Sequence, residues 1–504
     1  MPIPLFNSIA AWLLRKRIHQ IGLFLKYPEE VQVELLSQLL ANAQNTEVGR
    51  EHGFASIRNY EIFKNRVPVN RYENIEALIE RTRKGEQNVF WPSPIKWFAK
   101  SSGTTNAKSK FIPVSNEALE DCHYKAGKDM LCLYFNNNED SRLLTGKSLR
   151  LGGSKEIYQD NKTFYGDLSA IIIDNLPFWA EMSSTPSNRI SLMSEWESKL
   201  EAIVNETIQE NVTSIAGVPS WMLVLLNRVL DATGKQHLFD VWRNLEVYFH
   251  GGVSFNPYKE QYKKILPGSD FKYYEIYNAS EGFFAIQDRN DSDELLLMLD
   301  YGIFYEFIPM DVYGTPSEKV LPIWEVTLGK NYAMVITTNA GLWRYLIGDT
   351  VRFTSVRPYR IKVTGRTKHH INVFGEELII ENAEEALKSA CQKTESEIVD
   401  YTAAPVFMEN KDSGAHEWLI EFRRKPEDMD YFCELLDNAL KALNSDYEAK
   451  RYNNIALKKP ILHVARASLF HDWLKMKDKL GGQHKIPRLS NKRQYLEELM
   501  KIND

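Results

Sequence analysis

Residues 100–110 read Lys-Ser-Ser-Gly-Thr-Thr-Asn-Ala-Lys-Ser-Lys, and a strand-like apolar run stands on either side, Ile95–Ala99 before and Phe111–Val114 after. Hydroxyls, a glycine and lysines are thus concentrated in one turn. A polyphosphate needs this chemistry, because glycine lets the backbone approach closely, N–H and hydroxyl groups donate to phosphate oxygens, and lysine supplies positive charge. The second glycine of a P-loop is absent, and on its own the segment fits a solvated polar hairpin equally well.

The composition is that of a soluble globular protein with two or more domains. The chain has 504 residues, of which 43% are hydrophobic and 26% charged. A net charge of -5 argues against a general nucleic-acid binder, which usually carries a basic face. The four cysteines are scattered without metal-ligand spacing, so we expect reduced thiols in a cytoplasmic protein.

The N-terminus is apolar from Pro4 to Leu14 and basic from Arg15 to Arg17. This order is the reverse of a signal peptide, and the run is too short to span a bilayer. Its helical spacing predicts an amphipathic helix that docks on the protein's own core, with docking on a membrane surface as the alternative. We therefore expect no stable membrane insertion.

The rest of the chain predicts an α/β architecture with two domains. The first 90 residues are mostly helical, including Pro28–Ala43, and short apolar runs then alternate with helices. Residues 294–354 are dense in strands and are expected to form a sheet or partial barrel of their own. A boundary near 365–368 predicts a large domain, residues 1–367, and a compact α+β domain with a basic tail, residues 368–504.

Two further motifs place acidic groups after apolar runs. Tyr277-Asn278-Ala279-Ser280-Glu281-Gly282 follows such a run, so Glu281 would stand at a strand end, where open α/β sheets bind ligands. Its carboxylate suits Mg²⁺, and Tyr277 offers a ring for stacking. Asp349, after Gly348, is suited to accepting hydrogen bonds from ribose hydroxyls. An ordinary turn glutamate and a turn aspartate are the alternatives.

The last two motifs lie near the C-terminal domain. Residues 365–378 read Gly-Arg-Thr-Lys-His-His-Ile-Asn-Val-Phe-Gly-Glu-Glu-Leu, and residues 481–489 read Gly-Gly-Gln-His-Lys-Ile-Pro-Arg-Leu. The adjacent histidines would point in different directions, which argues against their joint metal ligation. The paired glycines before Lys485 predict either a loop that swings a cation or a solvated basic tail.

The order of the five motifs resembles the adenylate-forming superfamily, which includes acyl-CoA synthetases, luciferases and peptide-synthetase adenylation domains. Within it the chain resembles the auxin-responsive acyl-acid amido synthetase family, the plant hormone-conjugating enzymes and their bacterial relatives. The supporting phrases run from residue 101 to residue 488 and are Ser101–Thr105, Ala216–Met222, Gly251–Val253, Tyr277–Gly282 and Lys485–Arg488.

This resemblance implies a large multi-sheet N-terminal domain, a small mobile C-terminal domain and ATP bound between them. The residues implied in nucleotide binding are Ser101, Ser102, Gly103, Thr104, Thr105, Gly252, Val253, Tyr277, Ser280, Asp349 and Arg366. The loop from Ser101 to Thr105 would hold the phosphates, with Lys110 beside it. Gly252 and Val253 would line the adenine, on which Tyr277 would stack. Ser280 would reach the α-phosphate, Asp349 the ribose, and Arg366 the ribose or a phosphate.

The resemblance also implies the groups that act in the reaction. Glu281 would ligate Mg²⁺, Ser102 would hold a phosphate, and Lys485 would enter the cleft during adenylation. Lys368 would be the hinge of the small domain. Val218, Ser220 and Trp221 would flank the acyl acid.

The resemblance therefore implies a ligase that uses ATP and Mg²⁺ to activate a carboxylic acid as an acyl-adenylate. Pyrophosphate is released, and the acyl group passes to an amine such as an amino acid. Thioester formation, as in acyl-CoA synthetases, shares the first half-reaction and is the main alternative. A nucleotide-binding relative without catalysis is the other. The sequence identifies neither the acid nor the amine.

Overall fold

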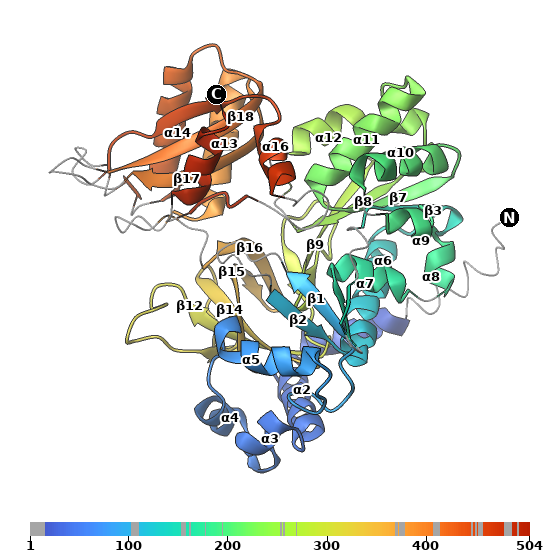
Figure 1. Cartoon of the computed structure of the whole chain (residues 1–504), viewed down its shortest axis with the longest axis vertical. Helices are drawn as coiled ribbons and strands as arrows, with labels where there is room; N and C mark the ends of the chain where they lie inside the picture. Colours follow the sequence, from blue (N-terminus) through green and yellow to red (C-terminus); the bar gives the residue numbers. More distant parts are fainter. Residues whose placement is uncertain are drawn as a thin grey trace.

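The computed structural model describes residues 16–101, 110–152, 158–160, 163–176, 178–193, 195–252, 255, 258–268, 270–367, 371, 378–406, 414–444, 447–448, 451, 457–477, 486–490 and 493–503. Within these residues the chain forms sheets of 4, 12 and 3 strands with helices packed around them (Figure 1). No helix in these ranges is long and apolar enough to cross a membrane.

The N-terminal segment is helical, as predicted. Helix α2 (Pro28–Ala43) has the predicted bounds, because proline in the first turn gives up no helical hydrogen bond. The helical residues 16–26 before it bury Ile21 and Phe24 in the core, so this part of the predicted amphipathic helix docks on the protein itself, and its earlier part lies outside the described residues. The helices that follow are α3 (Glu47–Glu51), α4 (Tyr60–Arg66) and α5 (Tyr72–Arg83).

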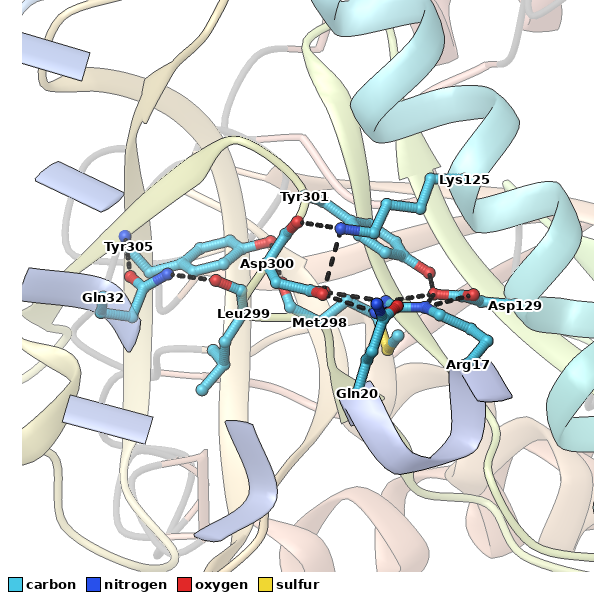
Figure 2. Close-up of polar contacts among 10 residues, drawn as sticks. All are labelled: Arg17, Gln20, Gln32, Lys125, Asp129, Met298, Leu299, Asp300, Tyr301 and Tyr305. Carbon is cyan, nitrogen blue, oxygen red and sulfur yellow. Dashed lines mark hydrogen bonds and ion pairs between the residues drawn. The ribbon is translucent and has the colours of Figure 1, made fainter. Parts of the chain in front are cut away.

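A buried polar network fastens the N-terminal helix to the rest of the large domain (Figure 2). Arg17 donates to Asp129 at 2.7 Å and to Asp300 at 2.8 Å. The hydroxyl of Tyr301 donates to Asp129 at 2.8 Å, and Lys125 pairs with Asp300 at 3.0 Å. Each carboxylate thus has a cationic partner, which offsets part of the cost of burying its charge.

The 12-stranded sheet has the strand order β13-β12-β14-β15-β16-β11-β10-β9-β8-β7-β3-β6. Its strands are β3 (Lys147–Arg150), β6 (Ser184–Thr185), β7 (Val212–Gly217), β8 (Val247–Gly251), β9 (Lys272–Ala279), β10 (Gly282–Ile286), β11 (Leu295–Leu297), β12 (Ile303–Pro309), β13 (Leu321–Pro322), β14 (Asn331–Thr338), β15 (Tyr345–Val356) and β16 (Tyr359–Arg366). Neighbours from β6 to β9 run parallel, and neighbours from β9 to β13 run antiparallel.

One expectation about this region was wrong. The strands of residues 294–354 do not form a separate sheet or barrel, because β11 pairs with β10 on one side and with β16 on the other. The antiparallel strands therefore continue the parallel ones. Local hydrophobic pattern does not reveal such a pairing between distant segments.

The parallel strands are covered on both faces. All five residues of β8 are buried, as expected for a parallel strand between two layers. Alternate side chains point to opposite faces. Tyr248 stacks on Tyr262 at a centroid distance of 5.1 Å, and Phe249 packs on Tyr134 at 5.9 Å. The helices on this side of the chain are α6 (Lys125–Asn137), α8 (Phe178–Met182), α9 (Asn188–Ser191), α10 (Trp196–Thr207), α11 (Pro219–Thr233) and α12 (Lys259–Ile265), while α7 (Leu168–Asp174) packs on the 4-stranded sheet.

The 4-stranded sheet carries the two strands that flank the Ser/Thr/Lys turn. Its strands are β1 (Trp97–Ser101), β2 (Lys110–Val114), β4 (Tyr158–Asp160) and β5 (Thr163–Gly166). β1 and β2 pair antiparallel, with Ser101 opposite Lys110. The predicted strand before the turn and the predicted strand after it therefore form one hairpin.

In its described residues the C-terminal domain contains the 3-stranded sheet and the helices that pack around it. These elements are α13 (Ile380–Thr394), β17 (Glu397–Val406), β18 (Ala415–Arg424), α14 (Met429–Leu443), β19 (Ile461–Ala465), α16 (Leu469–Met476) and α17 (Gln494–Met500). The expected basic tail is folded in its described part, because Leu469, Trp473, Leu496 and Leu499 form a buried cluster. The charged residues between these positions hid the helical period in the sequence.

Candidate active site

Several of the predicted site residues lie at one edge of the large sheet. The parallel strands β7, β8 and β9 end there, and open sheets of this kind bind ligands at the carboxyl ends of their strands. Gly251 ends β8 and pairs with Ile276 of β9, while Ser280 and Glu281 follow β9 directly. The motifs at residues 251–252 and 277–282 are therefore neighbours in space.

Each of the two positions at the end of β8 requires glycine for a different structural reason. A Cβ atom on Gly251 would lie 2.4 Å from the carbonyl oxygen of Ile276, so any side chain there would push β8 away from β9. Gly252 has a φ of +80°, a left-handed conformation that favours glycine. Together they let the backbone turn sharply at the edge where the nucleotide is expected.

Tyr277, Asp349 and Arg366 form a hydrogen-bonded group from three strands. The hydroxyl of Tyr277 on β9 donates to Oδ2 of Asp349 on β15 at 2.8 Å. Arg366 on β16 lies opposite Asp349 in the sheet, and its Nε donates to Oδ1 at 2.6 Å. Both oxygens of the Asp349 carboxylate are thus oriented by the protein. The three motifs that contain Tyr277, Asp349 and Arg366 therefore meet at one place.

The electrostatics of this group keep all its donors protonated. Burial, and next the charge of Asp349, raise the pKa of Tyr277 well above its usual value. The Asp349 carboxylate raises the pKa of the Arg366 guanidinium. The group is therefore a fixed carboxylate flanked by a neutral phenol and a permanent cation, which suits the recognition of hydroxyl and phosphate oxygens.

Glu281 lies in the turn between β9 and β10. Burial and the negative charge of Asp349 raise its pKa, while Arg366 and Lys110 oppose the shift. A cation placed beside Glu281 would relieve the cost of its charge, which is chemistry that fits Mg²⁺. The described part of the chain holds no group of three or more His, Cys, Asp or Glu side chains that could ligate a metal. Magnesium is usually bound through one or two carboxylates together with substrate phosphates, so a single glutamate is chemically compatible with such a site.

The other predicted residues divide into two groups. Ser280 is buried beside Glu281, and Ser101 ends β1, although the side chain of Ser101 is outside the description. The residues that lie outside the described ranges are Ser102, Gly103, Thr104, Thr105, Val253, Lys368 and Lys485. Their roles, and the stacking role of Tyr277, stay predictions.

Tyr345 belongs at this site but had no role in the sequence analysis. It begins β15 and is fully buried, and its hydroxyl has no hydrogen-bond partner among the described residues. Burial, and next the charge of Glu281, raise its pKa. In the sequence, its position four residues before Asp349 could have identified it as a candidate site residue.

Two tyrosines bind the backbone at residues 217–219, where the segment expected to flank the acyl acid begins. The hydroxyl of Tyr248 donates to the carbonyl oxygen of Gly217 at 3.0 Å, and that of Tyr262 donates to Pro219 at 2.8 Å. Val218 lies between these two carbonyls as the residue that precedes α11. The backbone of this turn is therefore fixed relative to β8 and α12.

Comparison with known proteins places this geometry in a family. The GH3 family N-terminal domain matches residues 17–271, the central domain residues 296–366 and the C-terminal domain residues 381–494. The Arabidopsis thaliana indole-3-acetic acid-amido synthetase GH3.3 is 21% identical over 91% of this chain and 89% of its own length. The Nicotiana attenuata jasmonoyl–L-amino acid synthetase JAR6 is 22% identical over 91% of this chain and 90% of its own length.

Solved structures share the fold. A GH3.15 acyl acid amido synthetase superposes with a TM-score of 0.78 at 18% identity, over 94% of this chain and 93% of that one. A 2-hydroxyisobutyryl-CoA ligase in complex with an acyl-AMP superposes with a TM-score of 0.60 at 13% identity, over 94% of this chain and 91% of that one. These structures confirm the α/β fold class, and the family matches confirm the resemblance predicted from the sequence.

Proposed function

Because the chain belongs to the GH3 family, we propose that it is an AMP-forming ligase that joins a carboxylic acid to an amine, with an amino acid as the expected amine. The named relatives that it matches over most of its length are acid–amino acid synthetases. The observation that carries the proposal is the convergence of Tyr277, Asp349 and Arg366 beside Glu281 at the carboxyl edge of the sheet.

In the first half-reaction, an oxygen of the acid attacks the α-phosphorus of ATP. The bond from the α-phosphorus to its bridging oxygen breaks, pyrophosphate leaves, and the acyl-adenylate remains. In the second, the amine nitrogen attacks the acyl carbon, AMP leaves and the nitrogen loses a proton. Little covalent chemistry falls to the protein, so positioning and charge stabilisation do most of the work.

We assign the positioning of the nucleoside to the group on β9, β15 and β16. Asp349 would accept hydrogen bonds from the ribose, held in place by Tyr277, whose ring would face the adenine. Arg366 would contact the ribose or a phosphate while neutralising Asp349. Gly252 and Val253 would line the adenine.

We assign the polyphosphate to the loop between β1 and β2 and to the turn after β9. Ser101–Thr105 and Ser280 would donate to phosphate oxygens, with Lys110 supplying charge. Magnesium bound at Glu281 would offset the negative charge that accumulates on the phosphates. Lys485 would do the same during adenylation and then withdraw as residues 368–504 rotate about Lys368.

We place the protein in the cytoplasm. All four cysteines, Cys122, Cys132, Cys391 and Cys433, are free thiols, and three of them are buried. Reduced, unpaired cysteines are typical of that compartment.

The test is a panel of carboxylic acids assayed for pyrophosphate release, followed by addition of amino acids or CoA to the adenylate. We expect one acid to release pyrophosphate and an amino acid to release AMP with formation of an amide. Release of AMP by CoA alone would support the thioester reaction instead. No acid-dependent pyrophosphate from any member of the panel would contradict the proposal.

A matched pair of variants tests the role of Lys485. Lys485→Ala should lower adenylation by roughly 100-fold, the scale of losing one transition-state charge partner. Lys477→Ala is the control, because Lys477 is an exposed lysine of the same domain that pairs with Glu498. Equal rates of pyrophosphate exchange in the two variants would remove Lys485 from the reaction.

A further inference from the structure

Two polar contacts join the C-terminal domain to helix α12 of the large domain. Nη2 of Arg488 donates to the hydroxyl of Tyr258 at 3.3 Å, and Lys264 pairs with Glu397. Tyr258 directly precedes α12 and Lys264 stands in its last turn, so the contacts lie at the two ends of one short helix. Figure 1 shows α12 on the side of the large domain that faces the C-terminal domain. We call these four residues the α12 clasp.

Arg488 is rigidly held by its own domain. Its guanidinium pairs with Asp400 and lies over the ring of Tyr401, 4.8 Å from the centroid. Its carbonyl oxygen accepts from the amide of Ala403 at 2.8 Å, and Leu489 bridges to Ala403 as a parallel extension of β17. Because Asp400 binds Nη1, Nη2 is left oriented towards Tyr258.

The other side of the clasp is equally rigid. Tyr258 is buried, and its amide donates to the carbonyl oxygen of Phe255 at 2.9 Å. Tyr262, one turn further along α12, donates to Pro219 at 2.8 Å and lies 3.3 Å from the hydroxyl of Tyr248. Helix α12 is therefore fixed to the turn that precedes α11, and it follows the β8 connection that begins with Gly252.

We propose that the α12 clasp seats the C-terminal domain in its adenylating orientation and that Arg488 is the positioning residue for the segment that carries Lys485. A single contact would allow rotation about itself, whereas two contacts at opposite ends of a helix fix an orientation. Arg488 follows Lys485 by three residues, so the position of Arg488 limits where the lysine can be. This inference rests on the proposed function.

The clasp is weak enough to open in every catalytic cycle. One neutral hydrogen-bond acceptor and one ion pair whose lysine is 61% exposed make up its contacts. Interactions of these kinds each change an equilibrium by about two- to tenfold. They can therefore bias the docked orientation without trapping it.

The experiment uses the full chain and four variants. Tyr258→Phe removes the acceptor of Arg488, and Lys264→Ala removes the ion pair. Tyr273→Phe is the control for the first, because Tyr273 packs against the buried hydrophobic cluster that contains Tyr258 and its buried hydroxyl has no hydrogen-bond partner among the described residues. Lys263→Ala is the control for the second, because Lys263 pairs within α12, with Glu260.

Two readouts separate orientation from chemistry. Spin labels at the exposed positions Val224 on α11 and Tyr431 on α14 report the distance between the domains. We expect each clasp variant to lower the docked population and the rate of ATP–pyrophosphate exchange by about two- to tenfold, and amide formation from preformed adenylate to stay at the wild-type rate. Both controls should match wild type.

An unchanged label distance in Tyr258→Phe and Lys264→Ala together would overturn the proposal, and so would an equal change in the controls. A shifted label distance with unchanged pyrophosphate exchange would also overturn it, because the clasp would then not set the adenylating orientation. The label distance does not depend on turnover. If the protein adenylates no acid, the proposed function is wrong, but the label distance still tests whether the α12 clasp sets the orientation of the C-terminal domain.

Discussion

Replacement of Glu275 by glutamine should stabilise the protein at alkaline pH and not at acidic pH. Glu275 lies on β9, and its backbone amide donates to Gln287 at 2.9 Å. Burial raises the pKa of its carboxyl to about 7, with further contributions from Asp293 and from Glu384 on α13 of the C-terminal domain, opposed by Lys362. The carboxylate is therefore a charge that the fold disfavours.

The magnitude follows from linkage. The carboxyl titrates near 4.5 when unperturbed and near 7 in the folded protein. One pKa unit corresponds to about 1.4 kcal/mol, so ionisation costs the folded state about 3 kcal/mol at most. Because the side chain is partly exposed and solvent screens its charge, we expect about 1–3 kcal/mol. The cost is small at and below pH 4.5, grows as the pH rises from 4.5 to about 7, and is complete above about pH 8.

Urea unfolding of wild type and Glu275→Gln at a series of pH values from 4.5 to 8.5 measures this difference. The variant should equal wild type at the acid end and exceed it at the alkaline end. Glu260→Gln is the control, since Glu260 is 72% exposed on α12. A difference that does not change with pH, or a variant less stable than wild type at pH 8, would refute the reasoning.

Three other outcomes are expected. Arg344→Met should lower the free energy of unfolding by about 3–5 kcal/mol, because it leaves the fully buried Glu306 without its cation. Arg228→Met is the control, because it breaks an exposed pair and should lower the free energy of unfolding by under about 1 kcal/mol. Similar urea midpoints for the two variants would contradict this reasoning. Asp349→Asn should raise the KM for ATP in pyrophosphate exchange by about 10- to 100-fold through loss of a charged acceptor, and an unchanged KM would exclude it from the nucleotide site. Glu281→Gln should abolish the saturable Mg²⁺ dependence of adenylation. Its unfolding midpoint at pH 8 should equal or exceed that of wild type, because burial disfavours the charge of the glutamate. A normal Mg²⁺ titration would exclude Glu281 as a ligand.

Much of the fold could be predicted where local sequence determines structure. Helix α2 begins at Pro28 and ends at Ala43 as predicted, because a proline marks its start and its apolar positions follow a helical period. Strands β1 and β2 were recognisable as the short apolar runs on either side of the Ser/Thr/Lys turn. The continuity of the large sheet was not, because the pairing of β11 with β16 joins segments that are far apart in the chain and carry no complementary local signal.

The candidate site shows the same division. The order of the motifs that contain residues 277, 281, 349 and 366 resembled that of adenylate-forming enzymes and so implied a nucleotide site, with a separate role for each residue. The structure adds that Tyr277 and Arg366 both bind the carboxylate of Asp349. The Arg488–Tyr258 contact could not be predicted at all, because it depends on how two domains meet and because Tyr258 belongs to none of the motifs.

Helix α12 connects three parts of the proposed chemistry. It follows the glycine turn at the proposed nucleotide edge, it fixes the turn at Pro219 through Tyr262, and it contacts the C-terminal domain through Tyr258. Linkage requires that any preference be mutual: if the acid binds more tightly when the C-terminal domain is docked, then acid favours docking by the same factor. Such coupling would need no movement across the sheet. Tyr258 and Tyr262 stand at the start and in the middle of the same short helix, so docking of the C-terminal domain and the geometry of the turn at Pro219 would be coupled through α12 itself.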